Sequence, residues 1–487
     1  MGSSSNFVND VMLYNNLGAG SVYNKPESNA TQWSLMSYLA RINYTLKHKY
    51  LFSVNARVDG SSRFGTNNKY GFFPSASAGW RISEEAFMEP VKEVISNLKL
   101  RASYGFTGNT EIGVYESLAT LGTSNWILGN QLVSGFFPNK IPNPDLKWER
   151  TGQFDIGLDL GLFNNRLRIT TDYYKKKTTD LLYSVAVPAT SGYQTMLKNI
   201  GSIENQGYEL SIESDNLTGA FSWTTAFNIA FNRNKVLELG GEEYKEMAEG
   251  DGHLKTGSVR RLIVGEPIGV FYGYRFDGIF QNEEECKQQT SSASPIGVGL
   301  RRYKDLNGDG KVDAANDREI LGDANPKFFG GLTNTFAYKG FELNVFLQYS
   351  YGNKILNYNA MELENPTGGQ NAYADMVNRW TPENPSNIYP KATTNRALLV
   401  SDRFIEDGSY LKLKTLSLSY SFPKINLKHI QGLRLYVTGQ NLLTWTKYRG
   451  YDPEVSYRGA STLEAGEDFG GYPQSRTFMF GIKLDIK

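Results

Sequence analysis

Residues 220–231, AFSWTTAFNIAF, decide the fold class of this chain. Large apolar side chains alternate along this stretch with small or polar ones: Phe221, Trp223, Phe227, Ile229 and Phe231 against Ala220, Ser222, Thr224, Ala226, Asn228 and Ala230. An alternation with a period of two residues predicts a β-strand. The stretch is longer than the ~5–6 residues of most strands in soluble proteins. It fits the ~9–11 residues of a tilted strand that crosses a membrane.

The same alternation recurs along the whole chain, for example in residues 153–161, 341–351, 433–441 and 478–486. Thirteen strands are expected, beginning near residues 33, 49, 73, 98, 151, 166, 206, 219, 328, 341, 409, 432 and 475. Their second face is mostly small and polar, as in a barrel whose strands face lipid on one side and water on the other. We therefore expect an all-β fold, a transmembrane antiparallel β-barrel.

The connections between the expected strands are of two kinds. Short turns fall at residues 47–49, 163–165, 216–218 and 338–340, whereas the long connections are rich in Gly, Asn, Pro and Asp. Outer-membrane barrels have short periplasmic turns and long extracellular loops. Residues 84–97 depart from this rhythm as a helix-like periplasmic connection, and residues 268–281 are expected to be β structure inside an extracellular loop.

The strand count bears on how much of a barrel the chain forms. Bacterial single-chain barrels have an even number of strands, and lipid does not tolerate an open sheet edge. Thirteen is odd, so we expect a partial barrel whose N-terminal strands are absent from this chain. Residues 1–32 are expected to form an extracellular loop-like segment, and residues 33–487 the C-terminal part of the barrel.

Composition and charge exclude several classes of function. The 51 Lys and Arg against 50 Asp and Glu leave a net charge of +1, without the basic surplus of a nucleic-acid-binding protein. One cysteine cannot form a disulfide framework, and three histidines leave little for metal–histidine catalysis. The sequence contains no Gly-x-Ser-x-Gly nucleophile motif. We expect no enzyme, no required cofactor and no nucleic-acid partner.

Residues 305–313, DLNGDGKVD, resemble the first half of a calcium-binding loop, in which oxygen atoms at alternate positions surround a hard cation. The Glu usual at position 12 is replaced by Asn316. One hypothesis is a structural Ca²⁺ site with a weak affinity of ~10⁻⁴–10⁻³ M. The other is a solvated turn without metal. The candidate ligands are Asp305, Asn307, Asp309, Asp313 and Asp317.

Three tryptophans in or near the loops, Trp126, Trp380 and Trp445, are candidates for stacking on sugar rings. The competing interpretation is an aromatic girdle at the membrane interface, or packing among the loops. That interpretation is favoured for each of the three. The sequence identifies no substrate-binding residue.

Segments spread along the chain resemble the SusC/RagA family of TonB-dependent outer-membrane transporters from Bacteroidetes, and they occur in the family's order. They include NARVDGSSRFG at 55–65, YGFFPS at 70–75, LKLRASYG at 98–105, NPDLKWE at 143–149, NQGYE at 205–209, YLKL at 410–413 and GQNL at 439–442. No one segment is specific by itself, but they are spread along nearly the whole chain and are together highly specific.

The resemblance implies more than the strands show. Members of the family are 22-stranded barrels with an N-terminal plug and a TonB-box segment. They lie in the cell outer membrane, pair with a SusD-like surface lipoprotein and import glycans or peptides, as in polysaccharide utilisation. This chain is then expected to supply about thirteen of the 22 strands, with the plug and the TonB-binding segment absent from it.

The function that follows is TonB-dependent nutrient import by the barrel part of a SusC/RagA-like transporter. The expected partners are a SusD-like lipoprotein, TonB, outer-membrane lipid and a glycan or peptide substrate of undetermined identity. Two alternatives stay open: a secreted β-rich glycan-binding or adhesion protein, and a non-functional fragment of the importer.

Overall fold

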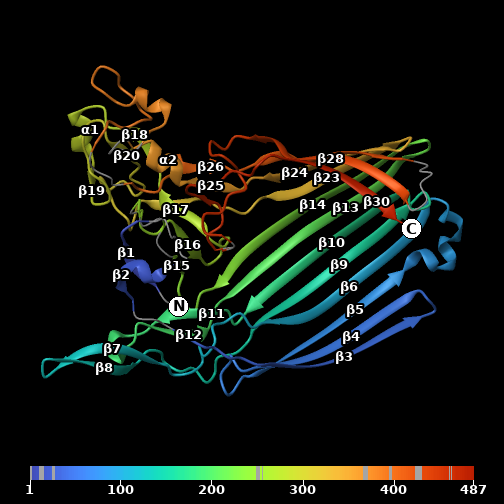
Figure 1. The fold of residues 1–487 in the computed structure, drawn as a ribbon, viewed down its shortest axis with the longest axis horizontal. Helices are drawn as coiled ribbons and strands as arrows, with labels where there is room; N and C mark the ends of the chain where they lie inside the picture. Colours follow the sequence, from blue (N-terminus) through green and yellow to red (C-terminus); the bar gives the residue numbers. More distant parts are fainter. Residues whose placement is uncertain are drawn as a thin grey trace.

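The computed structural model describes residues 3–9, 16–24, 28–247, 250, 253–254, 256–365, 371–393, 398–422, 430–459, 461 and 463–486. The described chain is dominated by one antiparallel sheet, with smaller sheets gathered at one end of it (Figure 1). None of the helices in these residues is long and apolar enough to cross a membrane.

Thirteen long strands form the large sheet, each paired with the next in chain order apart from the short strands of the loops. They are β3 (Leu35–Leu46), β4 (Tyr50–Ser61), β5 (Tyr70–Arg81), β6 (Ile95–Asn109), β9 (Glu149–Leu162), β10 (Leu167–Thr179), β13 (Ser202–Thr218), β14 (Phe221–Glu238), β23 (Phe328–Tyr338), β24 (Phe341–Tyr351), β27 (Tyr410–Ser421), β28 (Ile430–Thr446) and β30 (Thr477–Ile486). Each lies where the alternation in the sequence predicts a strand. The all-β fold is confirmed.

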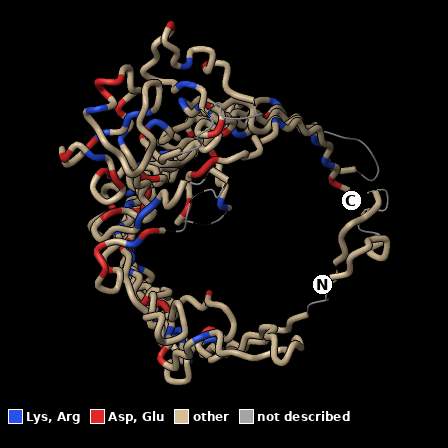
Figure 2. Tube along the Cα trace, turned by 90° about the vertical axis from the view of Figure 1, so that its left-hand side faces the viewer, with Lys and Arg blue, Asp and Glu red and all other residues tan. Residues whose placement is uncertain are grey.

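The two faces of the large sheet differ in chemistry. Phe227 on β14 lies between Ile212 on β13 and Leu332 on β23, and the row continues with apolar side chains on both sides. One residue further along β14, Asn228 lies between Ser211 and Gly331. We call these the apolar face and the polar face. Viewed end-on, the chain trace curves into an arc (Figure 2), and β3 and β30 are its edge strands among the described residues.

Short turns connect the strands at one end, which we call the turn end. Three of these turns contain residues with positive φ, at Lys47 and His48, at residues 163–165, and at Lys339 and Gly340. Such left-handed residues let two antiparallel strands connect tightly. Apart from the connection between β5 and β6, the long connections lie at the opposite end, the loop end (Figure 1).

The expected helix-like connection between β5 and β6 is present as two 3₁₀ helices, Ile82–Glu84 and Ala86–Val91. Glu85 fastens it to the sheet by accepting hydrogen bonds from Tyr50 Oη at 2.6 Å, Lys49 Nζ at 2.9 Å and Trp80 Nε1 at 3.1 Å. These bonds, that from Tyr50 first, lower the pKa of Glu85 to about 2.

The loops carry secondary structure of their own. Two hairpins project from the sheet: β7 (Leu121–Leu128) with β8 (Gln131–Pro138), and β11 (Leu182–Ala186) with β12 (Thr195–Asn199). The β structure expected within residues 268–281 is confirmed as β17 (Val270–Tyr274) and β18 (Phe276–Ile279). Residues Ser4–Phe7 and Gly20–Tyr23 form the hairpin β1–β2.

Further short elements fill the longest connections. They are β15 (Tyr244–Glu246), β16 (Arg260–Ile263), α1 (Glu283–Gln288), β19 (Thr290–Ser291), β20 (Arg301–Tyr303), β21 (Lys311–Val312), β22 (Arg318–Gly322), β25 (Lys354–Asn357), α2 (Tyr358–Leu363), β26 (Ile405–Asp407) and β29 (Glu467–Asp468). We call the body formed by residues 244–327, 352–408 and 447–471 the loop module.

Most buried apolar residues in the described part of the chain lie in the loops. The largest cluster is in the loop module and includes Phe271, Leu356, Tyr358, Met361 and Phe404, all fully or almost fully buried. A second cluster joins Phe64, Phe73, Leu146 and Trp148 above the ends of β4, β5 and β9. The loops therefore form packed bodies that the strands hold at one end of the sheet.

Candidate functional site: the polar face and the loop module

The polar face carries an open recess of about 290 Å³. Ser53, Ser77, Ser103 and Asp155 form one row across β4, β5, β6 and β9 in this recess. Their side chains are short, so they leave space above the sheet while offering hydroxyl and carboxylate groups to it. Such a wall can donate and accept hydrogen bonds with a polar molecule in the lumen.

Arg101 on β6 forms the charged side of the same recess. Its Nε lies 2.9 Å from Asp159 Oδ2, and its Nη2 lies 3.0 Å from Asp172 Oδ1 on β10. To reach Asp172 the side chain crosses β9 at Gly157, where an added Cβ would stand 2.7 Å from Arg101 Nη2. Gly157 is therefore needed for the ion pair that links three strands across the polar face.

A second recess, of about 390 Å³, lies nearer the loop end of the polar face. Two of its aromatic residues, Phe73 and Trp148, are each 7% exposed, and their ring centroids lie 5.4 Å apart at 66°. They are packed against each other and offer little free ring surface. On the same wall, Arg57 Nε donates to both carboxylate oxygens of Asp59 at 2.8 Å. This recess combines a charged rim with an apolar floor.

A third opening, of about 430 Å³, lies between the hairpins β7–β8 and β11–β12. Phe137 and Tyr193 stand on its two sides, and Lys140 and Glu116 form an ion pair at its edge. The first two recesses lie on the polar face, and the third opening lies between the hairpins of the loops. They are sites where the described chain can contact a passing molecule.

Buried ion pairs fix the loop module to the strands. Lys412 on β27 is 1% exposed, and its Nζ binds Asp452 Oδ1 at 2.6 Å and Glu454 Oε2 at 2.5 Å. Lys414 Nζ binds Glu454 as well, at 2.8 Å. Burial opposes ionisation of Glu454, but the hydrogen bonds from the two lysines outweigh it and hold the pKa of this carboxyl at about 2. The connection between β28 and β30 is thereby held against β27.

Two more buried acids hold the module together internally. Glu467 and Arg260 pair at 2.8 Å with both side chains 2% exposed. Glu364, which is fully buried, binds Arg403 at 2.5 Å and Arg449 at 2.8 Å. Buried charges are tolerated only when they are paired and hydrogen-bonded. These pairs connect segments that lie far apart in the sequence, and the module is therefore a tertiary unit.

The first three candidate calcium ligands lie in one exposed turn. Asp305 accepts hydrogen bonds from the backbone N–H groups of Gly308 and Gly310, both at 2.7 Å. Asn307 Nδ2 donates to Asp309 Oδ2 at 3.0 Å. The carboxylates of this turn are thus bonded to the turn itself.

The last two candidate ligands also bind backbone. Asp313 accepts from the N–H groups of Ala315 and Asn316, both at 3.0 Å. Asp317 is fully buried, and its two oxygens accept from Leu306 N at 2.8 Å and Asp313 N at 2.7 Å. Within the described ranges, no group of three or more His, Cys, Asp and Glu side chains is arranged to hold a metal ion. The calcium site stays a prediction.

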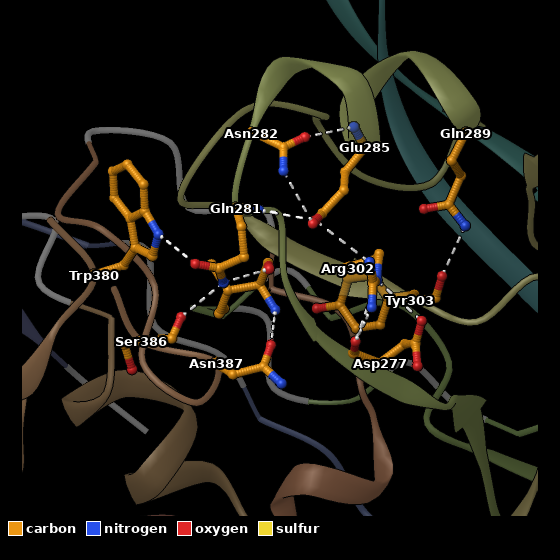
Figure 3. Close-up of polar contacts among 11 residues, drawn as sticks. Asp277, Gln281, Asn282, Glu285, Gln289, Arg302, Tyr303, Trp380, Ser386 and Asn387 are labelled. Atoms are coloured by element: carbon orange, nitrogen blue, oxygen red, sulfur yellow. Dashed lines mark hydrogen bonds and ion pairs between the residues drawn. The ribbon is translucent and has the colours of Figure 1, made fainter. Parts of the chain in front are cut away.

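Trp380 is engaged in packing. Its Nε1 donates to Gln281 Oε1 at 3.0 Å, while Gln281 Nε2 donates to the backbone oxygens of Ile279 and Ser386 (Figure 3). The indole also packs closely against Gly299: a Cβ added to this glycine would lie only 2.6 Å from Trp380 Cε3. Trp380 thus joins two loops, which agrees with the interpretation favoured from the sequence.

The other two tryptophans are half exposed. Trp126 lies on the hairpin β7–β8 and is 58% exposed; Trp445, at the loop end of β28, pairs with Leu411 on the apolar face and is 51% exposed. The position of Trp445 is that of an interfacial aromatic residue. Trp126 keeps a free ring among other exposed apolar residues.

The sequence did not single out Arg101, Lys412 or Glu364 as residues with a role. A signal for the first two is present in the strand pattern, since each is a charged residue that alternates with leucines inside a strand. Such a residue must face the polar side and requires a partner there. No comparable pattern marks Glu364, because its partners Arg403 and Arg449 are brought to it by the loop fold.

A sheet of this kind, apolar on one face and polar on the other, with long loops at one end, defines an outer-membrane β-barrel. Residues 2–442 match the family model described as "TonB dependent receptor-like, beta-barrel", and the chain belongs to this family. It is an outer-membrane protein of the TonB-dependent receptor class.

Individual members of this receptor class are also similar to the chain in sequence. TonB-dependent receptor P3 of Formosa agariphila is 41% identical over 485 residues, which are 98% of this chain and 48% of the relative. TonB-dependent receptor SusC of Bacteroides thetaiotaomicron is 32% identical over 476 residues, 94% of this chain and 44% of the relative. The chain therefore spans about half the length of the curated relatives that it matches.

One solved structure, described as "Structure of the RagAB peptide transporter", superposes with a TM-score of 0.81 and 27% identity. The superposition covers 98% of this chain and 50% of the RagAB chain. The resemblance to SusC and RagA inferred from the sequence motifs is confirmed.

Proposed function

We propose that this chain forms the wall and the loops of a SusC/RagA-like importer that takes up glycan or peptide oligomers across the outer membrane. The observation that carries the proposal is the thirteen-stranded sheet, with one apolar face, one polar face, two recesses on the polar face and an opening between the loop hairpins. The similarity to SusC and to the RagAB chain supports it.

In this proposal the chain performs no reaction. It contributes a passive wall, and the polar groups of Ser103, Asp155 and Arg101 offer hydrogen bonds to cargo or to a plug. A SusD-like lipoprotein would cover the loop end. TonB would act through the TonB-box segment that the family resemblance implies. The secreted glycan-binding alternative is disfavoured, because a soluble protein does not carry so extensive an apolar face.

The proposal is tested by growth of the native bacterium. A strain with the gene disrupted should fail to grow on one class of oligosaccharides or oligopeptides as carbon source, and the plasmid-borne full gene should restore growth. Undiminished growth on every oligomer that the wild type uses would contradict import as the function.

A matched pair of variants links the import to the polar face. Ser77→Trp should fill the recess of 290 Å³ and slow uptake, whereas Ala76→Trp on the adjacent apolar-face position should leave uptake unchanged. Both variants must reach the outer membrane in wild-type amounts for the comparison to hold. Equal uptake by the two variants would show that the cargo does not use this recess.

A further inference from the structure

Arg301, the first residue of β20, is a buried arginine without an acidic partner. The residue is 8% exposed. Its Nη2 donates to the backbone oxygen of Glu364 at 3.1 Å, and its Nε has no hydrogen-bond partner in the described part of the chain. An arginine side chain stays protonated in proteins. A full positive charge is therefore held where bulk water does not reach it.

The neighbouring charges do not neutralise Arg301. Glu364 is occupied by Arg403 and Arg449, and Arg449 also binds Glu406 at 2.7 Å. Arg403 and Arg449 thus occupy the two carboxylates, and Arg301 leaves this cluster with one positive charge in excess. Arg403 Nε is likewise buried without a hydrogen-bond partner among the described residues. An uncompensated buried charge is costly. The described protein groups of this cluster therefore lack one negative charge.

A small cavity adjoins the guanidinium. Its volume is about 40 Å³, and Asn365, which is 5% exposed, and Ser294 line it together with Arg301. One water molecule needs at least ~10–15 Å³ of such space. The cavity therefore has room for a single small ion with a water or two. A sugar ring or a peptide, which occupies a pocket of ~300–1,000 Å³, does not fit.

The segments nearest to the cavity in the chain supply no acid. Residues 366–370 follow Asn365, and residues 394–397 follow Thr393, another lining residue. Both segments lie outside the described residues, and their sequences, PTGGQ and TNRA, contain neither Asp nor Glu. A carboxylate from these segments is therefore excluded by composition.

We propose that the cavity beside Arg301 is a binding site for a small inorganic anion, chloride, with the Arg301 guanidinium as its cationic ligand. The Nε–H of Arg301, which lacks a hydrogen-bond partner among the described residues, and the side chains of Asn365 and Ser294, which line the cavity, can supply donors to the anion. Arg301 belongs to the connection between β14 and β23, and Asn365 to the connection between β24 and β27. A bound anion thereby ties two of the longest loops together, independently of what the protein transports.

The first test is a comparison of thermal stability in two salts. The purified full chain in detergent is melted in sodium chloride and in sodium gluconate at equal concentration. An ion that binds only the native state raises the melting temperature. We expect a higher Tm in chloride, and we expect Arg301→Met to abolish the difference. Equal Tm values for the wild type in the two salts would overturn the proposal.

A neighbouring arginine is the control. Arg302 is 31% exposed and binds Asp277 at 2.9 Å and Glu285 at 3.4 Å, so it has the partners that Arg301 lacks (Figure 3). Arg302→Met should lower the Tm equally in both salts and keep the difference between them. If Arg301→Met keeps that difference as well, the chloride effect arises elsewhere and the proposal fails.

The second test needs no variant. Crystals of the wild-type protein are soaked in sodium bromide, and anomalous scattering is recorded at the bromine edge. A peak within hydrogen-bond distance of Arg301 Nε is expected. Density for water alone at this place, without anomalous signal, would refute the anion site even if the Arg301→Met variant did not fold.

Discussion

Lys412 and Lys414 share one carboxylate but differ in burial, and this difference sets the consequence of losing each. Lys412→Met leaves Asp452 and Glu454 in a buried place without their main cation, and we expect a loss of about 3–5 kcal/mol in unfolding free energy. Lys414 is 29% exposed, so Lys414→Met should cost only ~0–1 kcal/mol. Denaturant unfolding of both variants measures the contrast, and equal losses would show that burial does not set it.

Glu454 makes the attachment of the loop module sensitive to acid. Its pKa is about 2 in the folded chain, below the ~4.3 of an unfolded Glu. Its contribution to stability is therefore full above about pH 5 and lost as the pH falls towards 2. Thermal melts across this range should show a decline that is less steep in Glu454→Gln. Parallel pH profiles for the wild type and the variant would contradict this role.

The calcium hypothesis can be tested through individual ligand residues. We expect weak binding, with a Kd of ~10⁻⁴–10⁻³ M, because the carboxylates of Asp305 and Asp313 already accept backbone N–H groups. Calorimetric titration of the protein with calcium chloride should show it, and Asp309→Asn should reduce it. The absence of heat at millimolar calcium would favour the solvated turn.

Among the elements, the membrane strands could be predicted, and the loop hairpins could not. Each long strand separates an apolar from a polar face, so its sequence alternates. Both faces of β7–β8 are exposed, and the consecutive residues Trp126, Ile127 and Leu128 are all apolar. The sequence of this hairpin therefore shows no alternation of apolar and polar side chains. The turn residues Gly129 and Asn130, both with positive φ, were the available signal, since such pairs favour tight hairpins.

The candidate site was less predictable than the strands. Alternation places Arg101 on the polar face, but its side chain can reach Asp172, two strands away, only because Gly157 lies opposite Arg101 on the strand between them. The pairing of Glu364 with Arg403 depends on the fold of the loop module. These contacts follow from strand register and loop packing, which a period of two residues does not encode.

The assignment of the apolar face can be tested on a single strand. Phe227→Arg places a charge on the lipid side of β14, beside the ring of Tyr349, and should cost ~2–4 kcal/mol if it lies at the bilayer midplane. Ala226→Arg points to the polar face, where Glu213 is its cross-strand neighbour, and should be nearly neutral. The yield of folded protein in the outer membrane measures both, and equal yields would argue against two distinct faces.

At the scale of the whole molecule, the turns and the loops lie at opposite ends of the sheet, and this arrangement implies one orientation in the membrane. In outer-membrane barrels the short turns face the periplasm and the long loops face the outside. The exposed groups at the two ends should therefore differ in their access to a reagent that cannot cross the outer membrane. Tyr472, 91% exposed, marks the loop end, and Thr218, the exposed last residue of β13, marks the turn end.

Cysteine labelling can follow this difference in a background where Cys286, the one native cysteine, is replaced by Ser. Tyr472→Cys should react with an impermeant maleimide on intact cells, because the loop end faces the medium. Thr218→Cys should react only after the outer membrane is permeabilised. Labelling of Thr218→Cys on intact cells, with Tyr472→Cys protected until permeabilisation, would reverse the orientation. It would also make the loop end, with the opening between its hairpins, face the periplasm, where an importer of external oligomers cannot capture its cargo.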